Sequence, residues 1–271
     1  MGIHPLRYVR LIGSFGRYAL ARELAFRANF LVKVAVEALW LVILIAFYRT
    51  VFARTSAVAG WPEDQYMFFV GCFFALNGVI ETLFLANCDD FAELVRTGDL
   101  DFLLLKPIDE QFLISCRKID WSSGPSVLMG FAVMVRALWH MGWHFDAGRL
   151  GAFFVLFACG TAIAYSFMLM LTSLSVWLVR NQSLMEMWWL FSSLARYPKE
   201  IFRGASWAEP IGLFFTFILP ILLVVNVPAD LMFHAIDRPM IGFTLVATLA
   251  LGLLSRRFFQ HALRSYRSAS S

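Results

Sequence analysis

The chain has 271 residues, of which 60% are hydrophobic and only 15% are charged, and its formal net charge is +4. A water-soluble domain carries about 25% charged residues, so this composition excludes an ordinary soluble enzyme or binding module. A membrane-spanning helix needs about 20 mostly apolar residues, so the chain has room for about six spans and little else. The sequence therefore predicts an all-α polytopic membrane protein.

The N-terminal segment, residues 1–28, is rich in arginine and contains a single acidic residue, Glu23. On a helix over residues 5–27, the arginines gather on one side, and aromatic and aliphatic side chains gather on the other. Such a helix suits the anionic headgroup layer of a bilayer. We expect residues 1–28 to form an interfacial elbow helix, followed by a six-span transmembrane domain over residues 29–271.

Apolar runs mark the spans. Five of them are predicted whichever way the rest of the chain folds: 30–48, 66–86, 125–139, 150–171 and 240–254. The loop 49–65 holds charged and turn-forming residues and is expected outside the cell.

The remaining span allows two arrangements. By hydropathy alone it covers residues 211–227, but Pro220 and Pro228 interrupt that stretch, and proline kinks or breaks a helix. In the alternative, residues 183–195 form the span, and residues 205–235 form a re-entrant pair of half-helices. Non-helical backbone is tolerated there only where protein or water satisfies it. Both arrangements give six crossings.

The ends of the chain are basic, which predicts the topology. The tail carries four arginines and no acid: Arg256, Arg257, Arg264 and Arg267. Basic residues near span ends are retained on the cytoplasmic side, so we expect both termini in the cytoplasm of a bacterial inner-membrane, multi-pass protein. Against this trend, the re-entrant arrangement places three basic residues outside: Arg196, Lys199 and Arg203.

The segment 87–120 is charged, net negative and expected in the cytoplasm. Residues 87–107 read as two short helices. Gly98 can end the first in a left-handed conformation, Asp99 can cap the second, and Pro107 stops it. A short helix with apolar side chains and a charged rim fits a groove on a cytosolic partner, whereas the alternative is a solvated loop.

The run NCDDFAELVRTGDLDFLLLKPID resembles the loop between spans two and three of small ABC-2 type transporter permeases. GWPEDQY, RYPKEIF, FILPILLVVNVPADLMF and ALRSYRSASS agree with that family in order, so the resemblance covers nearly the whole chain. It implies an export-type permease that pairs with a second permease copy or a paralogue and binds two copies of a separate ATPase subunit. It also favours the re-entrant arrangement. The implied coupling positions are Glu93, Arg96, Gly98, Asp99, Leu100, Asp101, Leu103, Lys106 and Pro107.

A phosphate-binding G-x-x-x-x-G-K-[ST] loop is absent from the sequence. None of its four lysines (Lys33, Lys106, Lys118 and Lys199) follows glycine or precedes serine or threonine. We therefore expect no cofactor in this chain, with ATP bound by the partner subunit, and we expect a transport subunit and not an enzyme. No feature points to a nucleic-acid partner.

Ionisable groups inside spans are costly and call for a functional hypothesis. Lys33 and Glu37 lie four residues apart in the first span and could meet, as do Asn77 and Glu81 in the second. Glu37, Asn77 and Glu81 could line a pathway, or they could hold helices together while Lys33 extends to the headgroups. Arg136 is expected to extend toward the headgroups in the same way.

Two rival functions remain open at this stage. One is a membrane scaffold or receptor that holds a cytosolic partner without transport. The other is an intramembrane lipid-modifying enzyme using the buried acids or His140 and His144, which are four residues apart. A pair at this spacing could share a metal, but the neighbouring Trp143 favours an interfacial position, and we expect no metal site.

Overall fold

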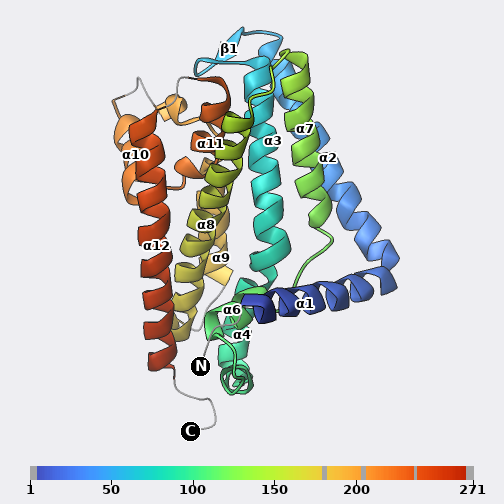
Figure 1. The fold of residues 1–271 in the computed structure, drawn as a ribbon, viewed down its shortest axis with the longest axis vertical. Coiled ribbons are helices and arrows are strands. Elements are labelled where there is room, and N and C mark those ends of the chain that lie inside the picture. The colour runs from blue at the N-terminus through green and yellow to red at the C-terminus, as the bar shows by residue number, and fades with distance from the viewer. Residues whose placement is uncertain (1–4, 179–181, 203–205, 235–236, 267–271) are drawn as a thin grey trace.

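The computed structural model describes residues 5–178, 182–202, 206–234 and 237–266. These residues form a helical bundle with one two-stranded antiparallel hairpin, β1 (Ala57–Val58) and β2 (Trp61–Pro62), at one end (Figure 1). We call this the hairpin end, and we call the opposite end the base. The predicted all-α polytopic class is confirmed.

The helices follow in chain order: α1 (Pro5–Ala25), α2 (Arg27–Phe52), α3 (Glu63–Ile80), η1 (Glu81–Leu85), α4 (Ala86–Thr97), α5 (Leu100–Leu104), α6 (Glu110–Cys116), α7 (Gly124–His140), α8 (Ala147–Leu178), α9 (Gln182–Leu194), η2 (Lys199–Phe202), α10 (Glu209–Leu213), η3 (Phe214–Ile218), α11 (Leu223–Phe233) and α12 (Arg238–Ser265). Here η1 and η3 are π-helical turns and η2 is a 3₁₀ turn.

Four helical stretches among the described residues are long and apolar enough to cross a membrane: α2, α3–η1–α4, α8 and α12. The second is a single helix of 35 residues, Glu63–Thr97, which we call the α3–α4 rod. The predicted span 66–86 lies within this rod, and a π-helical turn carries the helix on to Thr97 without a break.

The α3–α4 rod forms the centre of the bundle, and α2 forms its edge. In the most apolar 18-residue window, 61% of the rod's residues are buried, against 6% for α2. Small residues allow the central packing. A Cβ added at Gly71 would lie 2.7 Å from the backbone oxygen of Gly130 on α7, so the two helices meet backbone to backbone.

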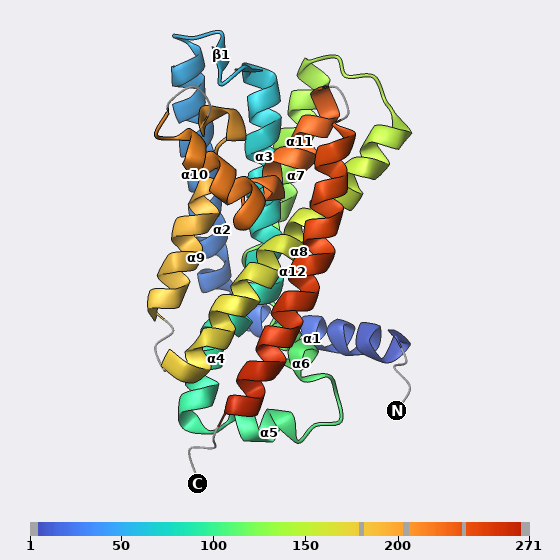
Figure 2. The ribbon, with the colours of Figure 1, turned by 90° about the vertical axis from the view of Figure 1, so that its left-hand side faces the viewer.

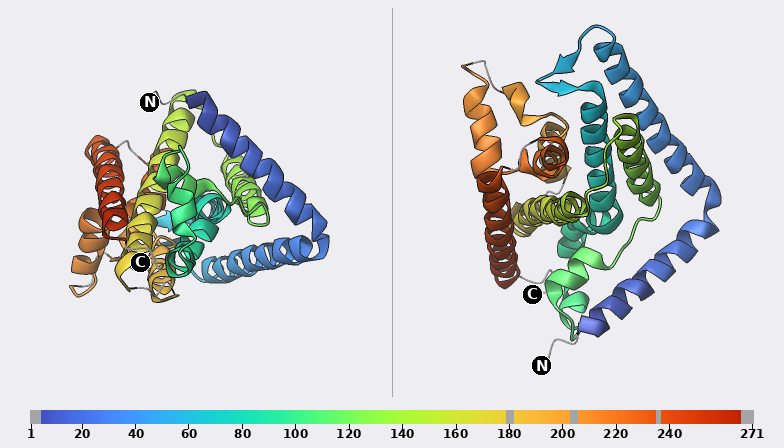
Figure 3. Two further views of the ribbon diagram at one scale, coloured as in Figure 1. Left: turned by 90° about the horizontal axis from the view of Figure 1, so that it is seen from below. Right: turned by 45° about the horizontal axis from the view of Figure 1, so that its top comes forward.

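The surface helix α1 lies across the base and meets α2 at an angle at the edge of the bundle (Figure 3). Its inner side packs on α6 and on the chain between α6 and α7. The Trp121 indole donates to the Gly16 carbonyl at 2.9 Å, and Tyr8 meets Phe112 edge-on at 4.7 Å between ring centroids. The C-terminal part of α12 reaches the same end of the bundle, so both ends of the described chain lie at the base (Figure 1).

Residues 211–227 do not form one continuous helix. The chain bends by 95° between Glu209–Ile218 and Leu223–Phe233, and both halves stay at the hairpin end (Figure 2). Pro220 lies at the bend. Buried Asn226 secures the second half: its Oδ1 accepts from the Lys199 amide at 2.7 Å, and its Nδ2 donates to the Leu222 carbonyl at 2.7 Å. Such a bend fits a re-entrant pair of half-helices or a single broken span.

Six crossings remain a prediction. The remaining two would be α7, with 17 residues, and α9, with 13, which are shorter than the about 20 residues of a typical span. Both run along the bundle between the base and the hairpin end (Figures 1 and 2). Arg203 and Arg267 lie outside the described residues.

Candidate functional site

The coupling segment, residues 87–120, forms the base of the bundle (Figure 2). It consists of α4, α5, α6 and their connections. Gly98 ends α4 with φ of 80°, the left-handed conformation that glycine adopts without steric cost, as predicted. Asp99 occupies the N-cap position of α5, but its carboxylate lies 2.9 Å from the Thr97 hydroxyl and accepts no hydrogen bond from the α5 backbone.

One side of the coupling segment is part of the protein core. The predicted apolar face of α4 is buried and packs against α8 and α12, together with α5 and α6. The buried cluster comprises Phe91, Leu94, Val95, Leu100, Ile114, Leu169 and Phe259. Leu100 is 0% exposed, so this predicted coupling residue supports α5 from within and does not reach its surface.

The opposite side of α5 is open. Phe102 is 69% exposed and Leu105 is 81% exposed, whereas Leu103 is half-buried. Exposed charged residues are close in the chain: Lys106 follows Leu105, and on α4 Arg96 binds Glu93 at 2.9 Å. Phe102 and Leu105 are not among the predicted coupling positions. Their spacing of three residues puts both on one helical face, but Leu100 and Leu103 have the same spacing, so the pattern alone does not single out the exposed pair.

Charged contacts tie the coupling segment to the rest of the base. The Arg256 guanidinium on α12 contacts the Asp109 carboxylate at 2.7 Å, and the other oxygen of Asp109 caps α6 by accepting from the Phe112 amide at 3.0 Å. Asp90 on α4 is paired with Arg117 at 3.0 Å and with Lys118. The excess of acidic groups in this segment is thus partly neutralised from within the protein.

The three polar residues predicted in the spans come together. Glu37 on α2 and Asn77 and Glu81 on the α3–α4 rod line one cavity of about 310 Å³, with Arg196 and Trp189 on its other side. Lys33 is not part of this set. Its ammonium lies 3.3 Å from the Asp120 carboxylate and 2.9 Å from the Ser122 hydroxyl, so it binds the base of the bundle and not Glu37.

Among the described residues, His140 and His144 have no third metal-ligating side chain grouped with them. His140 Nδ1 lies 2.9 Å from the Asp64 carboxylate at the hairpin end. Over the described ranges, no three His, Cys, Asp or Glu side chains gather in a group that could hold a metal ion.

Comparison with known proteins gives one result. The family model described as ABC-2 family transporter protein matches residues 38–270, which is most of the chain. No curated protein and no solved structure matches the chain significantly. The match includes the predicted coupling segment, the α3–α4 rod and the bent pair around Pro220.

Proposed function

Because the chain belongs to the ABC-2 family of transporter proteins, and is therefore the membrane component of an ABC transporter, we propose that it is the permease of an exporter driven by a separate ATPase subunit. One observation carries the ATPase part of this proposal: α5 presents Phe102 and Leu105 at the base, far from the apolar middle of the bundle. Exposed apolar groups in this position fit a groove on a soluble partner. Export follows from the resemblance to export-type permeases.

The base is built to transmit a displacement. Leu100 and Phe259 are fully buried in one cluster, so a push on α5 acts on α12 as well as on α4. Because α4 continues into α3, the same push reaches the middle of the bundle without crossing a flexible loop. ATP binding in the partner would thus shift the packing of the spans. A cargo is moved only if its affinity differs between the two states.

The cavity with Glu37, Asn77 and Glu81 is the proposed inner part of the cargo pathway. Its volume of about 310 Å³ lies at the lower end of small-molecule sites, and aromatic side chains such as Trp40 and Phe73 share the lining with the polar groups. In this proposal each permease supplies half a pathway. A second copy or a paralogue completes it, and two ATPase subunits bind the two bases.

The orientation follows from charge. Arginine-rich α1 and the basic end of α12 lie at the base, and basic residues near span ends are retained in the cytoplasm. We therefore place the base in the cytoplasm, with α1 at the surface of a bacterial inner membrane and the hairpin end outside.

The docking face can be tested directly by substitution. In the full chain co-expressed with the proposed ABC ATPase subunit, Phe102→Asp with Leu105→Asp should reduce the co-purified ATPase at least tenfold. Burying one such side chain is worth about 1.5–3 kcal/mol, and about 1.4 kcal/mol is a factor of ten in binding. ATP turnover stimulated by the permease should fall in parallel.

Phe145→Asp is the matched control, since Phe145 is 77% exposed at the other end of the bundle. It should leave ATPase binding unchanged. Full retention of the ATPase and of stimulated turnover by the double variant would show that α5 does not dock the partner. Retention of the ATPase without any transport-linked turnover would instead favour a scaffold or receptor.

A further inference from the structure

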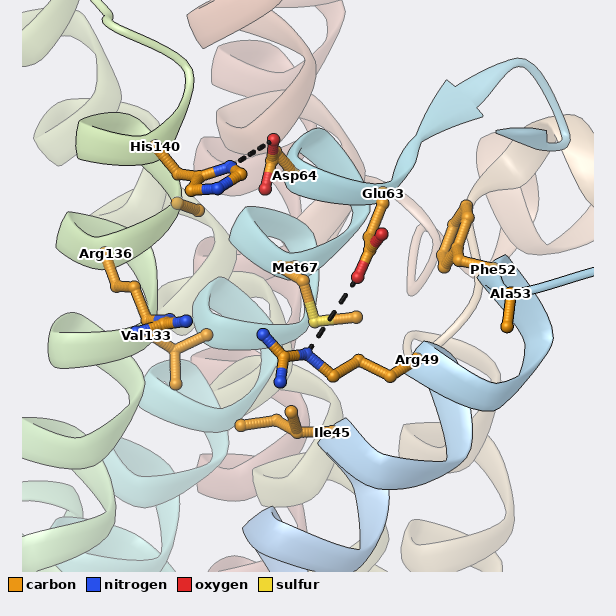
Figure 4. A pocket seen from close by; sticks show the side chains of 11 residues that line it. Ile45, Arg49, Phe52, Ala53, Glu63, Asp64, Met67, Val133, Arg136 and His140 are labelled. Carbon is orange, nitrogen blue, oxygen red and sulfur yellow. Dashed lines mark hydrogen bonds and ion pairs between the residues drawn. The ribbon is translucent and has the colours of Figure 1, made fainter. Parts of the chain in front are cut away.

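A second cavity, of about 600 Å³, lies at the hairpin end between α2, α3 and α7 (Figure 4). It is distinct from the cavity with Glu81, and no predicted coupling or pathway residue lines it. Its volume is within the range of ligand sites, about 300–1,000 Å³. Two arginines from facing helices, Arg49 and Arg136, contribute to the lining.

The acidic groups of this cavity are engaged near its mouth. Asp64 binds His140 at 2.9 Å. Glu63 lies 4.0 Å from the Arg49 guanidinium, which is a loose ion pair. Both acids belong to the first turn of α3, at the hairpin end of the cavity (Figure 4).

Arg136 has no such partner. Among the described residues, no carboxylate lies within 4.0 Å of its guanidinium and none of the hydrogen bonds involves it. It lies one helical turn, about 6 Å, deeper than His140 along α7, and Figure 4 shows it on the cavity side of that helix. An arginine at membrane depth without a counter-charge is costly. The cavity therefore offers a place for an anion.

The rest of the lining is apolar. Ile45, Met67 and Val133 lie beside and below the two arginines (Figure 4). The neighbouring side chains Val42 on α2 and Val135 on α7 are exposed, so the surfaces around the cavity are those that face hydrocarbon. A ligand that enters the cavity from the hydrocarbon would have an acyl chain as well as a charged head.

We propose that this cavity binds an anionic amphiphile, namely a phosphate or carboxylate headgroup held by Arg136 and Arg49, with its hydrocarbon chain against Ile45, Met67 and Val133. Guanidinium groups bind such heads through two parallel hydrogen bonds, which lysine cannot reproduce. The site lies at the opposite end of the bundle from α5, so it does not depend on the docking of an ATPase.

The test is binding of short-chain lipids to the purified full chain in detergent, by calorimetry and by native mass spectrometry. Dihexanoyl phosphatidylglycerol should bind, and Arg136→Gln should weaken it at least tenfold. Arg136→Lys should restore only part of the affinity. Arg238→Gln is the matched control, because Arg238 is an exposed arginine at the same end but outside the cavity, and it should bind like the unaltered protein.

Two further probes separate the possible occupants. Dihexanoyl phosphatidylcholine, with its zwitterionic head, and inorganic phosphate, with no chain, should both bind at least tenfold more weakly than phosphatidylglycerol. Equal binding of phosphatidylcholine would overturn the anionic part of the proposal, and equal binding of phosphate would overturn the amphiphile part. A shift in oligomeric state with Arg136→Gln, without loss of lipid, would assign the cavity to a second copy of the chain instead.

Discussion

At the scale of single residues, the contact between α3 and α7 depends on glycines, which have no side chain to hold the two helices apart. A Cβ at Gly130 would lie 2.6 Å from the Gly71 oxygen, and one at Gly78 would lie 2.8 Å from the Val127 amide nitrogen. Neither neighbour is a flexible side-chain end, so the helix backbones would have to separate. In contrast, a Cβ at Gly151 on α8 would meet nothing within 4 Å.

We predict that Gly130→Ala lowers the stability of the protein by about 1–3 kcal/mol, the usual cost of overpacking a core. Gly151→Ala should be neutral or stabilising, because alanine favours a helix over glycine by about 1 kcal/mol. Thermal unfolding in detergent measures both. Equal midpoints for the two variants would show that the close approach of α3 and α7 does not matter for stability.

At the scale of elements, α12, the last predicted span, packs against the coupling segment. Phe259 is fully buried against α4 and α5, with its ring 6.0 Å from that of Phe91. The Arg256–Asp109 pair lies beside it but is half-exposed, and such surface pairs contribute only about 0.2–1 kcal/mol. Apolar packing, more than this ion pair, holds the two elements together.

Phe259→Ala should therefore destabilise the protein by about 3–5 kcal/mol and weaken ATPase retention, because the cavity it leaves removes the support behind α5. Phe258→Ala is the comparison: its ring lies 5.7 Å from that of Trp177 between centroids, and it is half-buried. Unfolding midpoints and ATPase co-purification would be measured for both. Similar small effects for the two variants would contradict the role given to Phe259.

At the scale of the whole molecule, the proposed topology puts the base inside the cell and the hairpin outside. Ser56→Cys at the hairpin and Leu105→Cys at the base replace exposed residues at opposite ends. A membrane-impermeant maleimide should label Ser56→Cys in intact cells, and it should label Leu105→Cys only after permeabilisation. Labelling of Leu105→Cys in intact cells would invert the topology.

The two native thiols in the segment at the base, those of buried Cys88 and half-buried Cys116, should interfere little with this measurement. Burial raises the pKa of Cys116 to about 11, so its reactive thiolate is scarce at pH 7.5 and becomes abundant only as the pH approaches 11. The unaltered protein should therefore show slow background labelling that increases with pH.

Hydropathy located α2, α3, α8 and α12, because each has a run of apolar residues that only a bilayer-spanning helix accounts for. It did not show that α3 continues to Thr97, since a π-helical turn leaves no mark in composition. It also could not choose between a straight and a bent chain around Pro220. The bend is fixed by tertiary contacts such as those of Asn226 with Lys199 and Leu222, which join residues far apart in the sequence as well as near ones.

The candidate site was predicted in part. The glycine stop at residue 98 and the apolar face of α4 could be read from the pattern, whereas the exposed face of α5 could not. Five apolar side chains in the stretch from Leu100 to Leu105 look equivalent in sequence, and only packing against Phe259 decides that Leu100 is inside and Leu105 outside.

The length of the α3–α4 rod has a mechanical consequence. A helix of 35 residues is about 52 Å long, whereas the hydrocarbon layer is about 30 Å thick, so the rod extends well beyond it. It packs closely against α7 at Gly71 and Gly78, in the half nearer the hairpin end, and Asp64 and Glu81 on the same rod each line one of the two cavities. A tilt of this one helix would therefore change the shape of both cavities.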